Sequence, residues 1–192
     1  SDEAAVELTV GTVSGEYAIR QSRNYFPYIP GKSQQIMMTG VLGNSKENVV
    51  RRMGYYDDND GLFFEVNGNG FSVVVRSSTS GSSVDTVINE ADFNIEKPNM
   101  DLSKAQIFFI DFQWLGVGRV RFGCVIDGVL NYFHEMLNAN NVDTVYIAMP
   151  SLPVRYELRN TGTAASLSTL KEICSSVASE GGFELQGNDY GA

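Results

Sequence analysis

Apolar and polar side chains alternate along residues 107–135, and this alternation predicts three consecutive antiparallel strands. In the first strand one face carries Phe108, Ile110, Phe112 and Trp114, and the other carries Phe109, Asp111 and Gln113. In residues 118–126 one face carries Val120, Phe122, Cys124 and Ile126, and the other carries Arg119 and Arg121. A one-residue slip would set the apolar face of one strand against the arginines of the next. Only a loop with an odd number of residues keeps like faces together, so we expect a three-residue loop at 115–117. This register pairs Asp111 with Arg121 and Gln113 with Arg119.

The dipeptide Asp127-Gly128 predicts a tight turn between the second and third strands. Both central positions of a type I′ hairpin turn need a positive φ, which Asp and Gly tolerate. A regular hairpin would place Phe122 opposite Phe133 and His134 opposite Arg121.

A second series of strands is predicted at Val49–Tyr56, Leu62–Val66 and Phe71–Arg76. A four-residue loop at 67–70 pairs Val66 with Phe71, and the same register pairs Phe64 with Val73 and Leu62 with Val75. Residues 84–93 fit a short strand or an irregular segment. Residues 167–178 fit both a helical stripe and a strand, and the surrounding strands favour the latter.

Many short strands separated by turn residues predict an all-β fold, an antiparallel β-sandwich of the concanavalin-like or jelly-roll type. We expect residues 1–22 to be a lead-in strand or an arm, and residues 23–182 to form the sandwich. Residues 183–192 are expected to be a tail that could continue into a longer chain.

Composition narrows the function classes. The chain has 192 residues, and 43% of them are hydrophobic, so it is expected to fold. Its formal net charge of −9 would repel the phosphates of nucleic acid, so no nucleic-acid binding is expected. No apolar run has the length of a membrane span, so no membrane association is expected. The two cysteines lie far apart and there is one histidine, which excludes a zinc-spaced cluster.

Catalytic chemistry is sparse. His134 is the only histidine, and its neighbour Glu135 would lie on the opposite face of a strand. Asp111, Glu65 and Glu157 lie on predicted strands and could line a concave face, but they lack the close alternation of acids found in jelly-roll glycosidases. The simpler role of Asp111 is to pair with Arg121, a structural contact, so we expect no enzyme activity.

Two candidate binding features remain. The turn containing Asp57, Asp58 and Asp60 could hold calcium through several oxygen ligands, although Asp, Asn and Gly are also the residues that hairpin turns prefer. The sequence therefore predicts no cofactor, with calcium at this turn as the alternative. Tyr25, Tyr28, Tyr55 and Tyr56 could stack on sugar rings if they are exposed, and would otherwise pack in the core or at an interface. Trp114, at the end of an apolar row, is expected to anchor the core.

Four segments carry a family resemblance: SRNYFPYIPGKSQQIMMTG, RRMGYYDDNDGLFFEVNG, QIFFIDFQWLGVGRVRFGCVIDG and LPVRYELRNTGTAAS. Together they resemble a group of uncharacterised virion structural proteins of tailed DNA phages and other large DNA viruses. The likeness runs from about Ser22 to Gly182, and DFQWLGVGRVRFG is its most specific part. The spacing in GYYDDNDGLFFEVNG is also similar to laminin-G and concanavalin-like sandwiches.

The resemblance implies a non-enzymatic component on the virion surface or an appendage, such as a capsid decoration, spike, fibre or tail protein with a host-attachment role. It implies other virion proteins as partners and a homo-oligomer, and it supplies no catalytic residues. The alternative is a lectin-like carbohydrate-binding module that contacts host glycan. A jelly-roll glycosidase is the less favoured third hypothesis.

Overall fold

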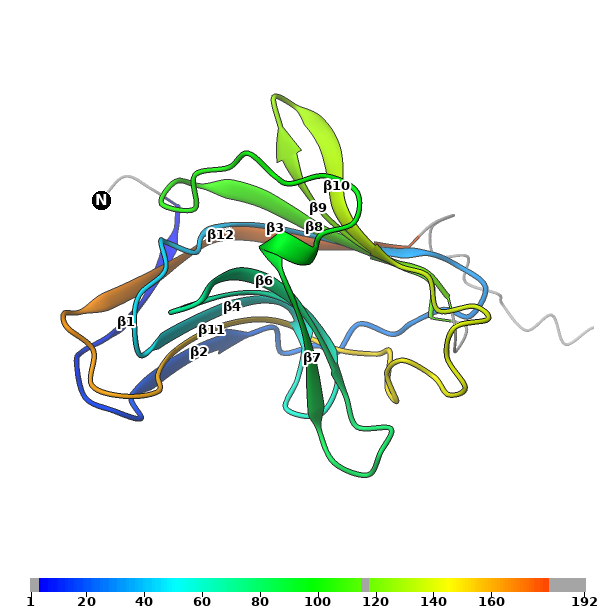
Figure 1. The fold of residues 1–192 in the computed structure, drawn as a ribbon, viewed down its shortest axis with the longest axis horizontal. Helices are drawn as coiled ribbons and strands as arrows, with labels where there is room; N and C mark the ends of the chain where they lie inside the picture. The colour runs from blue at the N-terminus through cyan, green and yellow to red at the C-terminus, as the bar shows by residue number, and fades with distance from the viewer. Residues whose placement is uncertain (1–3, 115–117, 180–192) are drawn as a thin grey trace, which may run out of the picture.

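The protein is a sandwich of two six-stranded antiparallel sheets, which confirms the predicted fold class (Figure 1). The computed structural model of the protein describes residues 4–114 and 118–179. The first sheet runs, in spatial order, β1 (Val6–Val10), β12 (Ser168–Ser179), β3 (Gln34–Val41), β8 (Gln106–Phe112), β9 (Val120–Ile126) and β10 (Val129–Met136). The second runs β2 (Tyr17–Gln21), β11 (Val154–Asn160), β4 (Val49–Tyr56), β5 (Gly61–Asn67), β6 (Gly70–Ser77) and β7 (Val84–Asn89). A single 3₁₀ turn, Glu90–Asp92, follows β7.

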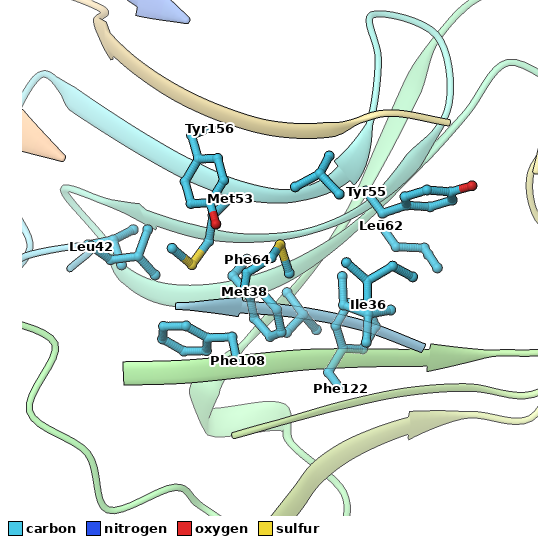
Figure 2. Close-up of a cluster of buried hydrophobic side chains, with 14 of the residues drawn as sticks. Ile36, Met38, Leu42, Met53, Tyr55, Leu62, Phe64, Phe108, Phe122 and Tyr156 are labelled. Carbon is cyan, nitrogen blue, oxygen red and sulfur yellow. The ribbon is translucent and has the colours of Figure 1, made fainter. Parts of the chain in front are cut away.

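The core lies between the sheets because alternate side chains of each strand point inward. In β3 buried and half-buried positions alternate along the whole strand, and Ile36 and Met38 are fully buried. Figure 2 shows Met38 and Phe108 of the first sheet facing Met53 and Phe64 of the second. The Phe64 and Phe108 rings lie 4.8 Å apart between centroids. Each fully buried side chain of this size contributes roughly 1.5–3 kcal/mol relative to an exposed one.

Most of the predicted register is confirmed. In β5 and β6, Leu62 pairs with Val75, Phe64 with Val73 and Val66 with Phe71. Asp111 pairs with Arg121 across β8 and β9. The predicted loop at 115–117 lies outside the described residues.

The turn between β9 and β10 also has the predicted geometry, because φ is 52° at Asp127 and 78° at Gly128. The segment 167–178, which fits two patterns, is a strand from Ser168 onward, within β12.

The predicted register of β10 is wrong beyond Tyr132. A β-bulge between Tyr132 and His134 shifts the pairing, so that Phe122 faces His134 and Arg121 faces Glu135. The bulge inserts Phe133 as an extra residue, and Phe133 enters the core and stacks on Phe93 at 4.8 Å. His134 is itself buried, and burial lowers the pKa of its imidazole.

The described part of the N-terminal segment, predicted as a lead-in strand or arm, is built into both sheets. Strand β1 pairs with β12 and forms one edge of the first sheet. Strand β2 pairs with β11 and forms one edge of the second sheet. The Asn160 side chain donates hydrogen bonds to the carbonyl oxygens of Gly11 and Val13 in the connection between them.

Within the described residues, no helix is both long and apolar enough to cross a bilayer.

Candidate functional site

The outer face of the second sheet gathers charged side chains from neighbouring strands. Because side chains alternate, residues that pair across the sheet share a face, and Glu157, Arg52 and Glu65 lie side by side on β11, β4 and β5. A hollow of about 420 Å³ lies over this face. Its lining is entirely polar and consists of Arg52, Asp58, Arg76, Ser83, Asp85, Glu157 and Arg159. We call this surface, together with Arg155, the arginine face.

One wall of the hollow comes from the end of the sheet. Strand β7 and the connection before it project away from the sandwich in Figure 1, and Asp85 and Ser83 come from this projection. Asp58 comes from the β4–β5 turn. Regular strands therefore supply the arginines and Glu157, whereas β7 and two connections supply the side.

The floor beneath the arginines is aromatic. Tyr56, Phe63 and Val74 form a small buried cluster on this outer face, separate from the main core. The Tyr56 and Phe63 rings lie 4.4 Å apart, and the guanidinium groups of Arg52 and Arg76 each lie 5.2 Å from the Phe63 centroid. Arg155 lies 5.3 Å from the Tyr56 centroid. Cations over ring faces are attracted by the ring quadrupole, so these contacts hold the arginines against the floor.

Two glycines make room for this floor. A Cβ at Gly54 would lie 2.3 Å from the Cβ of Phe63, and a Cβ at Gly61 would lie 2.1 Å from the Cβ of Tyr56. Gly61 also has φ of 147°, which residues with side chains rarely adopt. The aromatic rings can occupy the outer face because these two positions leave it bare.

Arg52 lies between two glutamates. Its Nε is 2.6 Å from Glu65 Oε2, and its Nη1 is 3.6 Å from Glu157 Oε1. Glu157 is almost fully buried and also lies within 3.5 Å of Arg155 and 3.2 Å of Arg159. A buried carboxylate is tolerated only when surrounding cations and donors compensate for its lost hydration, and these arginines do so.

Tyr56 completes the network from below, donating a hydrogen bond from its hydroxyl to Glu157 Oε2 at 3.4 Å. Burial, with the charge of Glu157, raises the pKa of Tyr56 well above its ordinary value, so the phenol stays a neutral donor.

The remaining carboxylates each face an arginine. Asp85 accepts two hydrogen bonds from Arg76, at 2.7 and 2.8 Å. Burial alone would raise the pKa of Asp85, but the hydrogen bonds and the charge of Arg76 lower it overall. Asp58 pairs with Arg155 at 2.7 Å, although the Asp58 side chain is 84% exposed and that of Arg155 only 7%. Arg76 and Arg155 are thus the donors, and Asp85 and Asp58 the acceptors, of two ion pairs on this face.

An exposed aromatic stands beside this network. Tyr17 of β2 pairs with Arg159 in the sheet, is 65% exposed, and lies 5.9 Å from the Arg159 guanidinium between ring centroid and Cζ. Sequence reasoning missed Tyr17. Tyr17, Ile19 and Gln21 occupy every second position of β2 and therefore share one face. This spacing was the available signal that the Tyr17 side chain lies on the same face as those two residues.

The structure corrects half of the predicted aromatic platform. Tyr55 and Tyr56 are fully buried, one in the core and one in the floor of the arginine face, so neither can stack on an external sugar. Tyr28 is half-buried, stacks on Phe112 at 5.7 Å and donates its hydroxyl hydrogen to the Lys32 carbonyl. Tyr25 is half-exposed but does not line the hollow.

The three carboxylates of the candidate calcium turn point in different directions and do not gather into one ligand set. Asp57 accepts hydrogen bonds from the backbone of Asn59 and Asp60, at 2.8 and 3.0 Å, which is the geometry of a turn. Asp60 is buried and accepts from Ser78 and from the Ala148 N–H. Asp58 pairs with Arg155 instead. Across residues 4–114 and 118–179, no three His, Cys, Asp or Glu side chains gather as a metal site would require.

The predicted structural residues lie elsewhere. Asp111 and Arg121 form an ion pair on the outer face of the first sheet, where the Arg121 guanidinium lies 3.9 Å from the Tyr132 ring centroid. Trp114 packs against the core and donates its indole N–H to the Ile147 carbonyl at 3.0 Å.

Solved structures place the fold among known proteins. A glycoside hydrolase family protein from Mycobacterium thermorestibile matches 90% of this chain and 76% of its own length, with 12% identity and a TM-score of 0.52. A legume lectin-like domain from Entamoeba histolytica matches 91% of this chain and 84% of its own, with 10% identity and a TM-score of 0.45. A GH43 glycoside hydrolase matches 90% of this chain at 13% identity and a TM-score of 0.47, and the chain spans only 34% of its length.

At this low identity the match to the glycoside hydrolase family protein shows a similar fold and nothing more. No protein-family description matches the chain, and no curated protein matches it. These structures give no link to a virus or a phage, so the predicted place in a virion stays a prediction.

Proposed function

We propose that the protein binds saccharide on the arginine face and does not cleave it. The observation that carries the proposal is the polar hollow of about 420 Å³, in which ordered arginines and carboxylates alternate over a rigid floor. Ligand sites are concave and use a few fixed polar groups for orientation. Guanidinium groups offer paired donors and carboxylates paired acceptors, a combination that suits the adjacent hydroxyls of a sugar ring.

Tyr17 supports the proposal from the rim. Its exposed ring lies next to Arg159, which lines the hollow, so a sugar held by Arg159 could rest its apolar face on the tyrosine. The fold also supports it, since a glycoside hydrolase family protein has a similar fold.

Binding without hydrolysis is proposed because the central carboxylates of this face are each engaged by an arginine. Glycoside hydrolysis needs one carboxylic acid kept protonated to deliver a proton to the leaving oxygen. Here Arg52 lies between Glu65 and Glu157, and Arg76 holds Asp85 by two hydrogen bonds. These contacts engage all three carboxylates with arginine donors, an arrangement that suits accepting hydrogen bonds from a ligand rather than delivering a proton to it.

The test is a glycan array followed by calorimetric titration of the best glycan. Tyr17→Ala is expected to weaken binding by about tenfold, in keeping with the loss of one aromatic contact. Tyr25→Ala is the matched control, because Tyr25 is half-exposed but does not line the hollow, and it should bind as the unaltered protein does. Absence of glycan binding, equal loss in both variants, or turnover of a bound polysaccharide would each overturn the proposal.

A separate proposal places the protein in a virion as a self-associating structural component on the surface or an appendage, where saccharide binding would serve host attachment. The resemblance carried by DFQWLGVGRVRFG supports it. Edge strands β7 and β10, with exposed Val84, Val87, Val129 and Leu130, offer surfaces for neighbouring subunits. Mass spectrometry of purified particles should find the protein at a copy number matching a symmetric assembly, and its absence from particles would contradict the proposal.

A further inference from the structure

The outer face of the first sheet has a hollow of its own, of about 400 Å³. It lies on the opposite side of the sandwich from the arginine face, because Asp111 and Arg121 alternate with the inward-facing Phe112 and Phe122. The side chains that matter in its lining are Ser33, Gln35, Asp111, Gln113, Arg119 and Arg121. We call it the first-sheet hollow.

Charge distinguishes this hollow from the arginine face. Its lining holds two arginines and one carboxylate, a formal charge of +1 in a protein whose net charge is −9. Glu135 lies opposite Arg121 in the sheet, yet it neither lines the hollow nor forms an ion pair with Arg121. The hollow is thus a locally positive site on an acidic surface.

The two arginines of the hollow differ in how many contacts their side chains make. Arg121 is held in place by its ion pair with Asp111 and by its contact with the Tyr132 ring, and its Nε is buried without a hydrogen-bond partner. The exposed Arg119 side chain has no ion pair or hydrogen bond to any other described residue. Its backbone is nevertheless fixed, because its carbonyl accepts a hydrogen bond from Gln113 N–H at 2.9 Å. A charged donor therefore lies directly before β9, with no hydrogen-bond or ion-pair partner among the described residues.

Neutral hydrogen-bond donors line the same hollow as Arg119. The Gln113 amide donates to Ser33 Oγ at 3.0 Å, which leaves the Ser33 hydroxyl hydrogen free to point elsewhere. Gln35 pairs with Asp111 across β3 and β8, so its side chain lies on the same face. An uncommitted guanidinium with hydroxyl and amide donors is the donor set that binds an oxyanion.

We propose that the first-sheet hollow binds an oxyanion group, the sulfate of a sulfated ligand or free inorganic sulfate, with Arg119 as its main contact. The net negative charge of the protein weakens this attraction only modestly. The Debye length is about 8 Å at physiological ionic strength, so distant carboxylates are screened while Arg119 acts at contact.

Equilibrium dialysis of labelled inorganic sulfate against the whole protein tests the site directly. We expect one sulfate bound per chain. Arg119→Gln should reduce the affinity by about tenfold, the loss of one charge-assisted hydrogen bond, and Arg119→Lys should retain part of it. Arg23→Gln makes the same charge change at an exposed arginine that does not line this hollow and should bind like the unaltered protein.

Competition identifies the source of the anion. Displacement of labelled sulfate by dextran sulfate but not by dextran, at a lower concentration of sulfate groups than free sulfate requires, would assign the site to a sulfated saccharide. Equal displacement by free sulfate would assign it to the inorganic ion. No binding, or an equal loss in Arg119→Gln and Arg23→Gln, would overturn the proposal. Fluorescence of Trp114, the residue next to Gln113 and the only tryptophan, should change in the same titration.

Discussion

On both outer faces of the sandwich, arginines lie over aromatic rings, but the two faces differ in the balance of positive and negative side chains. On the second sheet, Tyr56 and Phe63 lie under Arg52, Arg76 and Arg155. On the first, Phe109 is fully buried against Tyr132, and Arg121 covers the Tyr132 ring. Arg52, Arg76, Arg155 and Arg159 each face a carboxylate, whereas Arg119 on the first sheet faces none among the described residues.

This difference teaches that an arginine over an aromatic ring is a structural unit, and that its neighbours decide its chemistry. A fully paired set of charges offers both donors and acceptors and suits hydroxyl groups. A set with one spare cation suits an anion.

The largest expected loss of stability comes from disrupting the aromatic floor of the arginine face. Gly54→Ala puts a Cβ within 2.5 Å of the Phe63 Cβ and Cα and the Leu62 carbonyl oxygen, so Phe63 must leave its site. We expect a loss of about 3 kcal/mol in the free energy of unfolding, measured by urea denaturation. Gly68→Ala, where the nearest atom would be 3.5 Å away, is the control and should cost less than about 0.5 kcal/mol. Equal stability of the two variants would show that the floor is not close-packed.

The next effect compares the central carboxylates of the two faces. Glu157→Gln leaves Arg52, Arg155 and Arg159 less compensated, and we expect a loss of about 2–3 kcal/mol in stability. Asp111→Asn leaves only Arg121, at a more exposed position, and should cost about 1 kcal/mol. Glu7→Gln, at an exposed carboxylate, should be neutral in the same urea titrations. A larger loss in Asp111→Asn would reverse the assignment of the more tightly paired face.

The smallest effect is a pH dependence at the edge of the arginine face. Since the pKa of folded Asp85 is below its ordinary value, its ionised form favours the folded state. That stability is present above the unfolded pKa, about 3.9, and is lost as the pH falls through the lower folded value. Asp85→Asn should therefore cost up to about 1 kcal/mol at neutral pH and nothing at strongly acidic pH, in parallel urea titrations. A difference that persists in acid would mean that the ion pair is not its source.

Sequence reasoning predicted local pairing well because alternation and turn chemistry act over a few residues. Phe64 pairs with Val73, and the Asp127-Gly128 turn forms as expected. The bulge at Phe133 was missed because nothing in its strand signals an extra residue, and only the nearby Phe93 explains why Phe133 turns inward.

The candidate site was harder to predict because it depends on the outer face of a sheet. Tyr55 and Tyr56 are consecutive and point to opposite faces, so burial of both requires a second apolar cluster that alternation does not predict. The directions of Asp58 and Asp60 depend on the distant partners Arg155, Ser78 and Ala148. Glu65 and Glu157 were recognised as strand carboxylates, but their shared partner Arg52 appears only when β4 lies between β5 and β11.

The central claim is that saccharide binds over the paired charges of the second sheet. The most direct measurement is the NMR signal of each arginine Nε–H during titration with the best glycan from the array. The account predicts shifts at Arg52, Arg76 and Arg159, which line the hollow, while Arg119 and Arg121 stay unchanged. Shifts confined to Arg119 and Arg121, or none at any arginine while glycan binds, would contradict it.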